Sequence, residues 1–449
     1  MADSVVRAET TVVVARSTVA AVGPDTSFSL PEDVERIPCG GRYLLPGLAD
    51  MHVHVGHRTE LLSYLLAGVT TVVNLGGDHI DLFSGDRMSI LSLRDAVESG
   101  DVVGPTVYSA GQALDGDPPT GPFQRALASV DEAVAAVDEQ AAEGFDFIKV
   151  YDSLDEERHR AIVDRASTHG LAVFGHVPEA VGVDGTLASG QAVIAHAEEL
   201  YPAIEGAVDQ GAAIEALASN LRKAGVAIIP NGAFVQGLVR QLEDLEAELA
   251  HPEVAYLEPA VRVWWDRRYN YYVNRDDPSA LLEQSRRRVA WIRDLVVALH
   301  GEGVPMLSGS DASIPVALPG LGLHRELGEL TAAGLDPYEA LRTATIDAGA
   351  FVAKHRPERG RFGEIEVGHR ADLLVLDENP LDDLEALGGV VGVVVRGQWW
   401  PAEELRDLRG AASGDTKSSV QGSTAPGWDP VGRRPEAPTA GPLSEPKGR

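Results

Sequence analysis

The chain has 449 residues, of which 44% are hydrophobic, and it contains one cysteine. This composition is typical of a globular protein with a large core, and the longest apolar runs are too short for a membrane span of about 18–20 residues. The formal net charge of −30 argues against nucleic acid and anionic membranes as partners, because phosphate groups bind to positive surfaces. One cysteine allows no intrachain disulfide, so we expect a reducing, cytoplasmic location.

The N-terminal flank, residues 1–45, contains the stretch "TTVVVARSTVAAVGP", whose β-branched residues are typical of strands. The C-terminal flank, residues 360–405, contains "GEIEVGHRADLLVLDENP" and "VVGVVVRGQWW", which are also typical of strands and turns. The two flanks bracket the central region of the chain. We therefore expect them to pair into one small β-sandwich domain.

Eight short apolar segments alternate with helix-like stretches in the central region, residues 46–359. Most segments are continuous apolar runs, as in strands buried in a parallel sheet. Helix-like stretches such as "VDEAVAAVDEQAAEG" end in glycine, the residue favoured just after a helix. This alternation predicts an α/β fold, a (β/α)8 barrel of the TIM type. The eight segments are residues 47–54, 69–76, 105–111, 145–152, 171–177, 192–199, 226–232 and 304–312.

A long helical insertion, residues 233–300, separates the seventh and eighth segments. It includes the aromatic and arginine-rich stretch "VRVWWDRRYNYYVNRDD". Loops that follow barrel strands lie on the active-site face, so the insertion is a candidate lid. Packing on the outside of the barrel and an oligomer interface are the alternatives, and the sequence leaves them open. Residues 410–449 contain few apolar residues, which predicts a disordered tail.

Metal-binding and charged residues lie at the ends of five predicted strands, where a barrel places its active site. His52 and His54 are two residues apart, so their imidazoles point to one face of a strand while Val53 points to the other. Imidazoles and a carboxylate are the ligands that suit zinc or a similar divalent metal. The candidate metal ligands are His52, His54, Lys149, His176, His196 and Asp311.

Lys149 is unusual because it lies in the apolar stretch "FIKVY", where burying an ammonium group is costly. It either pairs with an acid in the barrel mouth or is carboxylated by CO2, and the resulting carbamate can bridge two metal ions. Tyr151 faces the same way as Lys149 and is a candidate substrate contact, with simple filling of the barrel mouth as the alternative. Asn231 ends the seventh strand and is a second candidate substrate contact.

Several stretches together resemble the amidohydrolase superfamily, in the branch of imidazolonepropionase-like proteins, metal-dependent Xaa-Pro dipeptidases and ochratoxin amidases. They include "PGLADMHVH", "FIKVYD", "IAHAEE", "SGSDA" and "GEIEVGHRADLLVLDENPLDD". The resemblance implies two divalent metal ions, with Zn²⁺ expected. It implies that His52, His54 and Asp311 hold the first ion. His176 and His196 would hold the second, with carboxylated Lys149 as the bridge.

Two positions depart from the dipeptidase pattern. The stretch "IIPNGAFVQ" has Asn231 where the resemblance implies a tyrosine that touches the substrate carbonyl. The loop "GQALDGDPPTGPF" lacks the histidine that some dipeptidases place near the substrate carboxylate. Prolidase specificity therefore does not transfer directly to this chain.

The sequence predicts a binuclear metal-dependent hydrolase that cleaves a C–N bond of a small molecule, such as a dipeptide or an N-acyl amino acid. Metal-bound hydroxide would attack the carbonyl, and Asp311 would carry the proton to the leaving nitrogen. A cyclic amide or imide hydrolase and a lactone or ester hydrolase are alternatives with the same metal site. A non-catalytic barrel relative is the alternative from another class. We expect a small-molecule substrate and neither nucleic acid nor a membrane as partner. The composition is compatible with a homo-oligomer.

Overall fold

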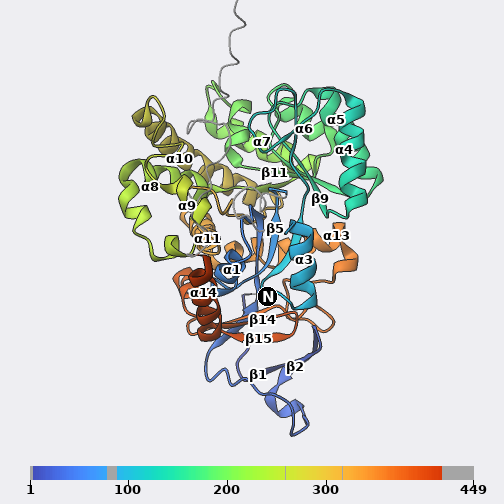
Figure 1. Cartoon of the computed structure of the whole chain (residues 1–449), viewed down its shortest axis with the longest axis vertical. Coiled ribbons are helices and arrows are strands. Elements are labelled where there is room, and N and C mark those ends of the chain that lie inside the picture. The colour runs from blue at the N-terminus through green and yellow to red at the C-terminus, as the bar shows by residue number, and fades with distance from the viewer. Residues whose placement is uncertain (1–3, 78–87, 258, 316, 417–449) are drawn as a thin grey trace, which may run out of the picture.

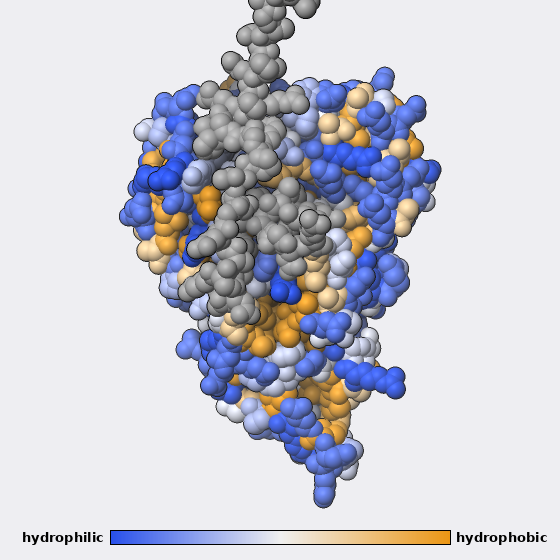
Figure 2. Space-filling view, in the orientation of Figure 1, coloured by the Kyte–Doolittle hydropathy of each residue, from blue (hydrophilic) through white to orange (hydrophobic). Residues whose placement is uncertain are grey.

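The computed structural model describes residues 4–77, 88–257, 259–315 and 317–416. It is a mixed α/β structure with a larger part that carries most helices and a smaller end formed by β1, β2, β14 and β15 (Figure 1). Within the described ranges, no helix is both long enough and apolar enough to cross a membrane. The visible surface is mainly hydrophilic, with a hydrophobic patch near the junction of the two parts (Figure 2).

The two flanks of the chain share one antiparallel sheet at the smaller end. Its strand order is β15-β14-β13-β3, so a strand from the N-terminal flank pairs with strands from the C-terminal flank. A separate hairpin pairs β1 with β2, and a bridge links Thr18 to Arg370. These pairings bring the flanks together, while their packing as a sandwich stays a prediction. The strands are β1 (Thr10–Ala15), β2 (Thr18–Pro24), β3 (Tyr43–Pro46), β13 (Leu373–Leu376), β14 (Val390–Val395) and β15 (Gln398–Pro401).

The central strands form two parallel sheets, one of order β4-β5-β6 and one of order β12-β11-β10-β9-β7-β8. Seven of the eight predicted segments contain a regular strand. The eighth segment is present as isolated parallel bridges, from Met306 to Ile228 and from Ala312 to Val53. The strands are β4 (Leu48–Val53), β5 (Val69–Asn74), β6 (Thr106–Ser109), β7 (Leu114–Asp115), β8 (Arg125–Ala126), β9 (Phe147–Val150), β10 (Ala172–Gly175), β11 (Val193–Ala195) and β12 (Ala227–Ile229).

Helices between the strands begin and end where their local chemistry dictates. Ser129 precedes α4, and its side chain accepts a hydrogen bond from the backbone of Glu132, which satisfies a free amide of the first turn. Gly144 ends α4 with a φ of 91°, a left-handed conformation that glycine adopts without strain. The helices are α1 (Glu60–Leu66), α3 (Ile90–Ser99), α4 (Val130–Glu143), α5 (Glu156–Thr168), α6 (Gly182–Ser189), α7 (Gln210–Ala224), α11 (Leu321–Ala333), α12 (Pro337–Thr343) and α13 (Ile346–His355).

The insertion forms α8 (Gly232–Leu249), α9 (Pro259–Trp265) and α10 (Pro278–Glu302). The last described helix, α14 (Ala402–Thr416), packs against α1 (Figure 1). Residues 410–416 are therefore helical, and the prediction that the disordered tail begins at residue 410 is wrong for them. The apolar residues that precede them, such as the buried Leu405, fix the helix against the core and let it continue. Residues 417–449 lie outside the described residues.

One buried apolar cluster receives side chains from all eight predicted segments. It combines large aromatic rings with smaller aliphatic groups. Its members include Met51, Val73, Tyr108, Phe147, Phe174, Val193, Ile229 and Leu307. A second and larger cluster joins the outer faces of strands to the helices.

Candidate active site

Four histidines and one aspartate come together from the ends of four predicted strands. Oδ1 of Asp311 lies 2.8 Å from Nε2 of His54 and 3.2 Å from Nε2 of His52. Oδ2 of Asp311 lies 3.8 Å from Nε2 of His196. The ring of His196 in turn lies 4.9 Å from the ring of His176. The structure thus gathers these five predicted ligands around one point.

The backbone at these strand ends is unusual. His196, Asn231 and Asp311 have φ values of 67°, 51° and 60°, in the left-handed region that non-glycine residues seldom adopt. Gly309 packs directly on His52, where a Cβ would lie 2.6 Å from the Cβ of His52. Such strain is found mainly where the surrounding structure enforces it at a functional site.

Buried side chains fix these strand ends to one another. Asp50 accepts hydrogen bonds from the amide and the hydroxyl of Ser310, at 2.9 and 2.6 Å, and burial raises the pKa of Asp50 to about 7. Oδ1 of Asn231 accepts a hydrogen bond from the amide of His196 at 3.2 Å, and Nδ2 of Asn231 donates to the carbonyl of Gly309 at 2.8 Å. Asn231 is fully buried, and these two hydrogen bonds engage both ends of its side-chain amide. A contact between Asn231 and the substrate stays a prediction.

His176 is surrounded by acidic groups that we did not predict from the sequence. Its Nδ1 lies 2.6 Å from Oδ1 of Asp152 and 3.5 Å from Oε1 of Glu199. The ring of Tyr151 stacks on His176 at 4.1 Å, which places this predicted substrate contact beside the ligand cluster. The sequence signal for the acids is their position just after a ligand strand, in "KVYD" and "HAEE".

Burial sets the charge state of the cluster. It lowers the pKa of His52 well below the usual value and that of His196 to about 3, so both imidazoles are neutral near pH 7. Burial would raise the pKa of Asp311, but the charges that His52 and His196 carry when protonated and the hydrogen bond from His54 outweigh burial and hold that pKa well below its usual range. The site therefore presents the neutral imidazoles of His52 and His196 beside an ionised carboxylate.

Lys149 lies in the same cluster and is almost fully buried, with 1% of its surface exposed. Burial lowers the pKa of its amine to about 8, against the attraction of Asp311, Asp152 and Glu199. Within the described residues, Nζ of Lys149 has no hydrogen-bond partner. A buried amine in this state needs a partner, and the described residues do not supply one.

The cluster fits a divalent metal. One ligand atom each from His52, His54 and Asp311 lies within 4.8 Å of the others, and the same holds for Asp152, His176 and Glu199. Among the described residues, neither ring nitrogen of His52 makes a hydrogen bond, although the ring is fully buried. Neutral imidazoles with a carboxylate are a typical donor set for Zn²⁺, so a metal ion would satisfy these atoms.

The insertion adds two aromatic side chains that sequence reasoning missed. Phe234, in the first turn of α8, lies with its ring 5.7 Å from the ring of His196. Tyr272, from the segment between α9 and α10, lies 6.3 Å from Phe234. The sequence shows that the insertion is rich in aromatic residues, but helical spacing alone does not indicate which of them reach the site.

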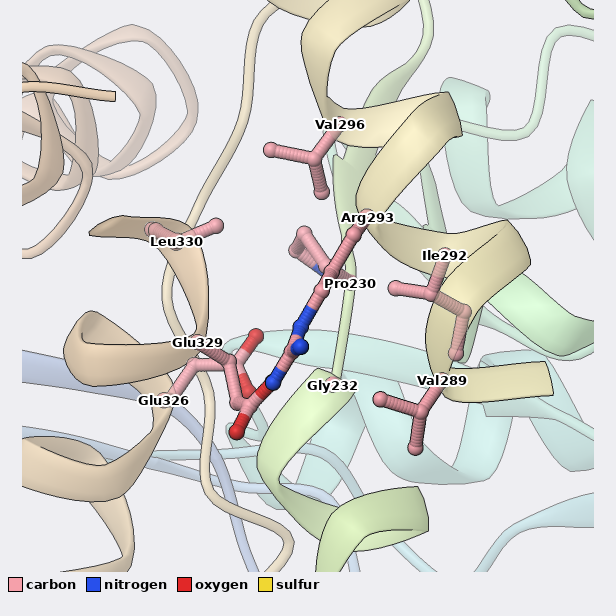
Figure 3. A pocket seen from close by; sticks show the side chains of 9 residues that line it. All are labelled: Pro230, Gly232, Val289, Ile292, Arg293, Val296, Glu326, Glu329 and Leu330. Carbon is pink, nitrogen blue, oxygen red and sulfur yellow. The ribbon is translucent and has the colours of Figure 1, made fainter. Parts of the chain in front are cut away.

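Two cavities lie near the site. The smaller, of about 10 Å³, has room for about one water molecule and lies between α8, α10 and α11, where Arg293 and Glu329 point toward one another (Figure 3). The larger, of about 690 Å³, has Asp152 and Glu199 in its wall and thus adjoins His176. A cavity of that volume is in the range that holds a small organic molecule.

Comparison with known proteins places the chain in a family. Residues 43–400 match the description "Amidohydrolase family". Bottromycin amidohydrolase is 26% identical, with a TM-score of 0.68 over 89% of this chain and 85% of that chain. A Xaa-Pro dipeptidase with bound methionine is 20% identical (TM-score 0.65, 87% and 95% covered), and Aspergillus niger ochratoxinase is 18% identical (TM-score 0.62, 87% and 91% covered). A search of curated proteins finds no match.

The match over most of its length shows that the chain belongs to the amidohydrolase family. The resemblance inferred from the sequence is confirmed, as is the enzyme class, a hydrolase that acts on carbon–nitrogen bonds. The two structures below 25% identity show a shared fold.

Proposed function

We propose that the protein is a binuclear metal-dependent amidohydrolase that cleaves an amide or peptide bond of a small molecule, such as a dipeptide or an N-acyl amino acid. The observation that carries the proposal is the cluster of imidazoles around Asp311, together with the buried amine of Lys149, which lacks a partner among the described residues. The names of bottromycin amidohydrolase and the Xaa-Pro dipeptidase support an amide or peptide substrate.

The proposed architecture is a closed (β/α)8 barrel with its site at the carboxyl ends of the strands. Bridges between Ala110 and Phe147, Ile228 and Met306, and Val53 and Ala312 link the two parallel sheets and the eighth segment in ring order. The apolar cluster that receives side chains from all eight segments also supports closure. The flanks would form the accompanying β-sandwich.

The metal assignment follows the donor groups. His52, His54 and Asp311 would hold one ion, and His176 and His196 the second, with N6-carboxylated Lys149 between them. Zn²⁺ is the expected metal. The lowered pKa of Lys149 supports carboxylation, because only the neutral amine forms the new N–C bond with CO2 and releases a proton. When bound, divalent ions supply Lewis-acid polarisation of a carbonyl group and lower the pKa of water.

The chain's own residues then handle the proton. Asp311 is ionised near pH 7, and as a carboxylate it would accept a proton from the attacking water and deliver it to the leaving nitrogen. Tyr151, beside His176, is proposed to contact the substrate. Asn231 is proposed as a second substrate contact, through its side-chain amide. The hydrogen bond that Asn231 accepts from the amide of His196 also supports a role in positioning the His196 backbone.

The same site suits other acyl substrates. A cyclic amide or imide hydrolase and a lactone or ester hydrolase remain the alternatives, because the pocket walls and not the ligand cluster select among them. A non-catalytic role is less well supported, since all six ligand positions are filled. From the sequence we further propose a cytoplasmic location and a homo-oligomer. The partner would be a small molecule, and neither nucleic acid nor a membrane would bind.

A hydrolysis screen followed by mass spectrometry tests the proposal. Zinc-supplemented protein is incubated with dipeptides, N-acyl amino acids, lactams and lactones, and each reaction is repeated with chelator-treated protein. We expect chelator-sensitive cleavage of an open-chain amide, and the Asp311→Asn variant should retain most of its metal while losing turnover. Cleavage of rings or esters alone would refute the substrate claim, and near-normal rates in Asp311→Asn would remove Asp311 as the proton carrier.

A further inference from the structure

Phe234 and Tyr272 stand side by side at the ligand cluster. Both rings pack on a small apolar group formed by Leu238, Ala312 and Ala317, and Ala312 directly follows Asp311 in the chain. The Phe234 ring meets the His196 ring edge-on at 67°. Burial and, next, the charge of Asp311 raise the pKa of the Tyr272 phenol, so the phenol lies within electrostatic reach of that carboxylate. Two aromatic faces of the insertion thus border the proposed reaction centre.

The segment that carries Tyr272 is firmly anchored. Nδ2 of Asn270 donates a hydrogen bond to Oε1 of Gln241 on α8 at 2.8 Å, and both side chains are almost fully buried. Oδ1 of Asn270 accepts a hydrogen bond from the amide of Tyr272 at 3.0 Å. The same helix thus bears Phe234 and holds the turn that bears Tyr272. The two rings form one fixed surface and not two independent side chains.

This surface is partly exposed. Phe234 and Tyr272 are half-buried, whereas the strand-end residues beside them, His196 and Asp311, are buried. The neighbouring Tyr271 differs, because 41% of its surface is exposed and its ring faces the guanidinium of Arg275 at 4.1 Å. Aromatic faces bind flat or apolar groups by stacking and by removing apolar surface from water.

We propose that Phe234 and Tyr272 form the specificity wall of the active site and select substrates with an aromatic or large apolar group next to the scissile bond. The inference rests on the proposed hydrolase function and adds a substrate class to it. It also gives the insertion a role in the site, because its first helix and its central turn supply the wall.

The test measures kcat/KM for matched dipeptides. Phenylalanylglycine is compared with alanylglycine, and glycylphenylalanine with glycylalanine, so that either side of the scissile bond is probed. We expect the unmodified protein to prefer phenylalanine on one side by about 10- to 100-fold. Phe234→Leu and Tyr272→Leu should each lower that ratio by about 3- to 10-fold, the range expected for loss of one aromatic contact. Tyr271→Leu is the matched control and should leave the ratio within about 2-fold.

The ratio of the two kcat/KM values separates a specificity role from a structural one, because a misfolded variant loses activity toward both substrates equally. Metal content and melting temperature are measured for each variant, and the conservative Phe234→Tyr variant should keep the ratio. Equal rates with alanine and phenylalanine on both sides would overturn the inference, as would an unchanged ratio in both leucine variants. If the protein cleaves only esters, the proposed amide substrate fails, and the same ratio measured with matched esters still decides the role of the wall.

Discussion

At the scale of single residues, Lys149 carries the most information. It lies on β9 among apolar neighbours with 1% of its surface exposed. An amine in that position destabilises the fold unless another group satisfies it. Its nearest charged groups are also the candidate metal ligands and their neighbours. The physical cost of burying Lys149 is therefore what the proposed metal centre would offset.

Replacing Lys149 with alanine tests that explanation. Lys149→Ala should reduce the metal content to about one ion or less per chain, because the shared ligand between the two metal sites is lost. Inductively coupled plasma mass spectrometry measures the metal, and ¹³C NMR of protein prepared with labelled bicarbonate detects the carbamate directly. Lys223→Ala, at an exposed position of α7, is the control and should retain full occupancy. Two ions bound to Lys149→Ala would refute the carbamate assignment.

At the scale of elements, a buried pair of side-chain amides joins two parts of the insertion. Asn270 and Gln241 are 0% and 1% exposed, and their hydrogen bond joins the turn before α10 to α8. Gln241→Leu removes the acceptor and leaves the side-chain NH2 group of Asn270 buried without this hydrogen bond. We expect a loss of about 1–3 kcal/mol in the free energy of unfolding, together with faster hydrogen exchange in the 268–274 turn.

The matched control for this change is Gln210→Leu, because Gln210 is exposed in the first turn of α7. Urea unfolding and hydrogen exchange are measured for both variants. Equal stability of the two variants, with unchanged exchange at residues 268–274, would contradict an anchoring role for the pair.

The same elements show what a sequence predicts and what it does not. Seven strands follow from continuous apolar runs, and the gathering of His52, His54, His196 and Asp311 follows from their place at strand ends. Phe234 and the buried acids around His176 depend on how the insertion and loops pack, which no local pattern encodes. The helical start of the predicted tail was missed because residues 410–416 are small or polar, whereas the earlier part of the same helix contains the buried Leu405.

At the scale of the whole molecule, Arg370 joins the flanks to the central strands. Its guanidinium lies 2.6 Å from Oδ2 of Asp372 and donates hydrogen bonds to the hydroxyls of Tyr108 at 3.1 Å and Thr71 at 2.7 Å. Arg370 and Asp372 have side-chain exposures of 9% and 1%. A buried charge pair of this kind links the C-terminal flank to β5 and β6, so the flanks and the central strands should unfold together.

Arg370→Met tests this coupling. The substitution leaves the Asp372 carboxylate buried without its cation, although the amide of Arg396 still donates to it at 2.8 Å. We expect the free energy of unfolding to fall by about 3–5 kcal/mol, because removing one partner of a buried ion pair costs far more stability than removing one partner of an exposed pair. Arg42→Met breaks the exposed ion pair with Asp377 and should lower the free energy of unfolding by about 0–1 kcal/mol. Calorimetry should show one transition that moves to lower temperature in Arg370→Met. Two separate transitions in the unmodified protein, or equal effects of the two variants, would mean that the flanks fold independently of the strands that carry the site.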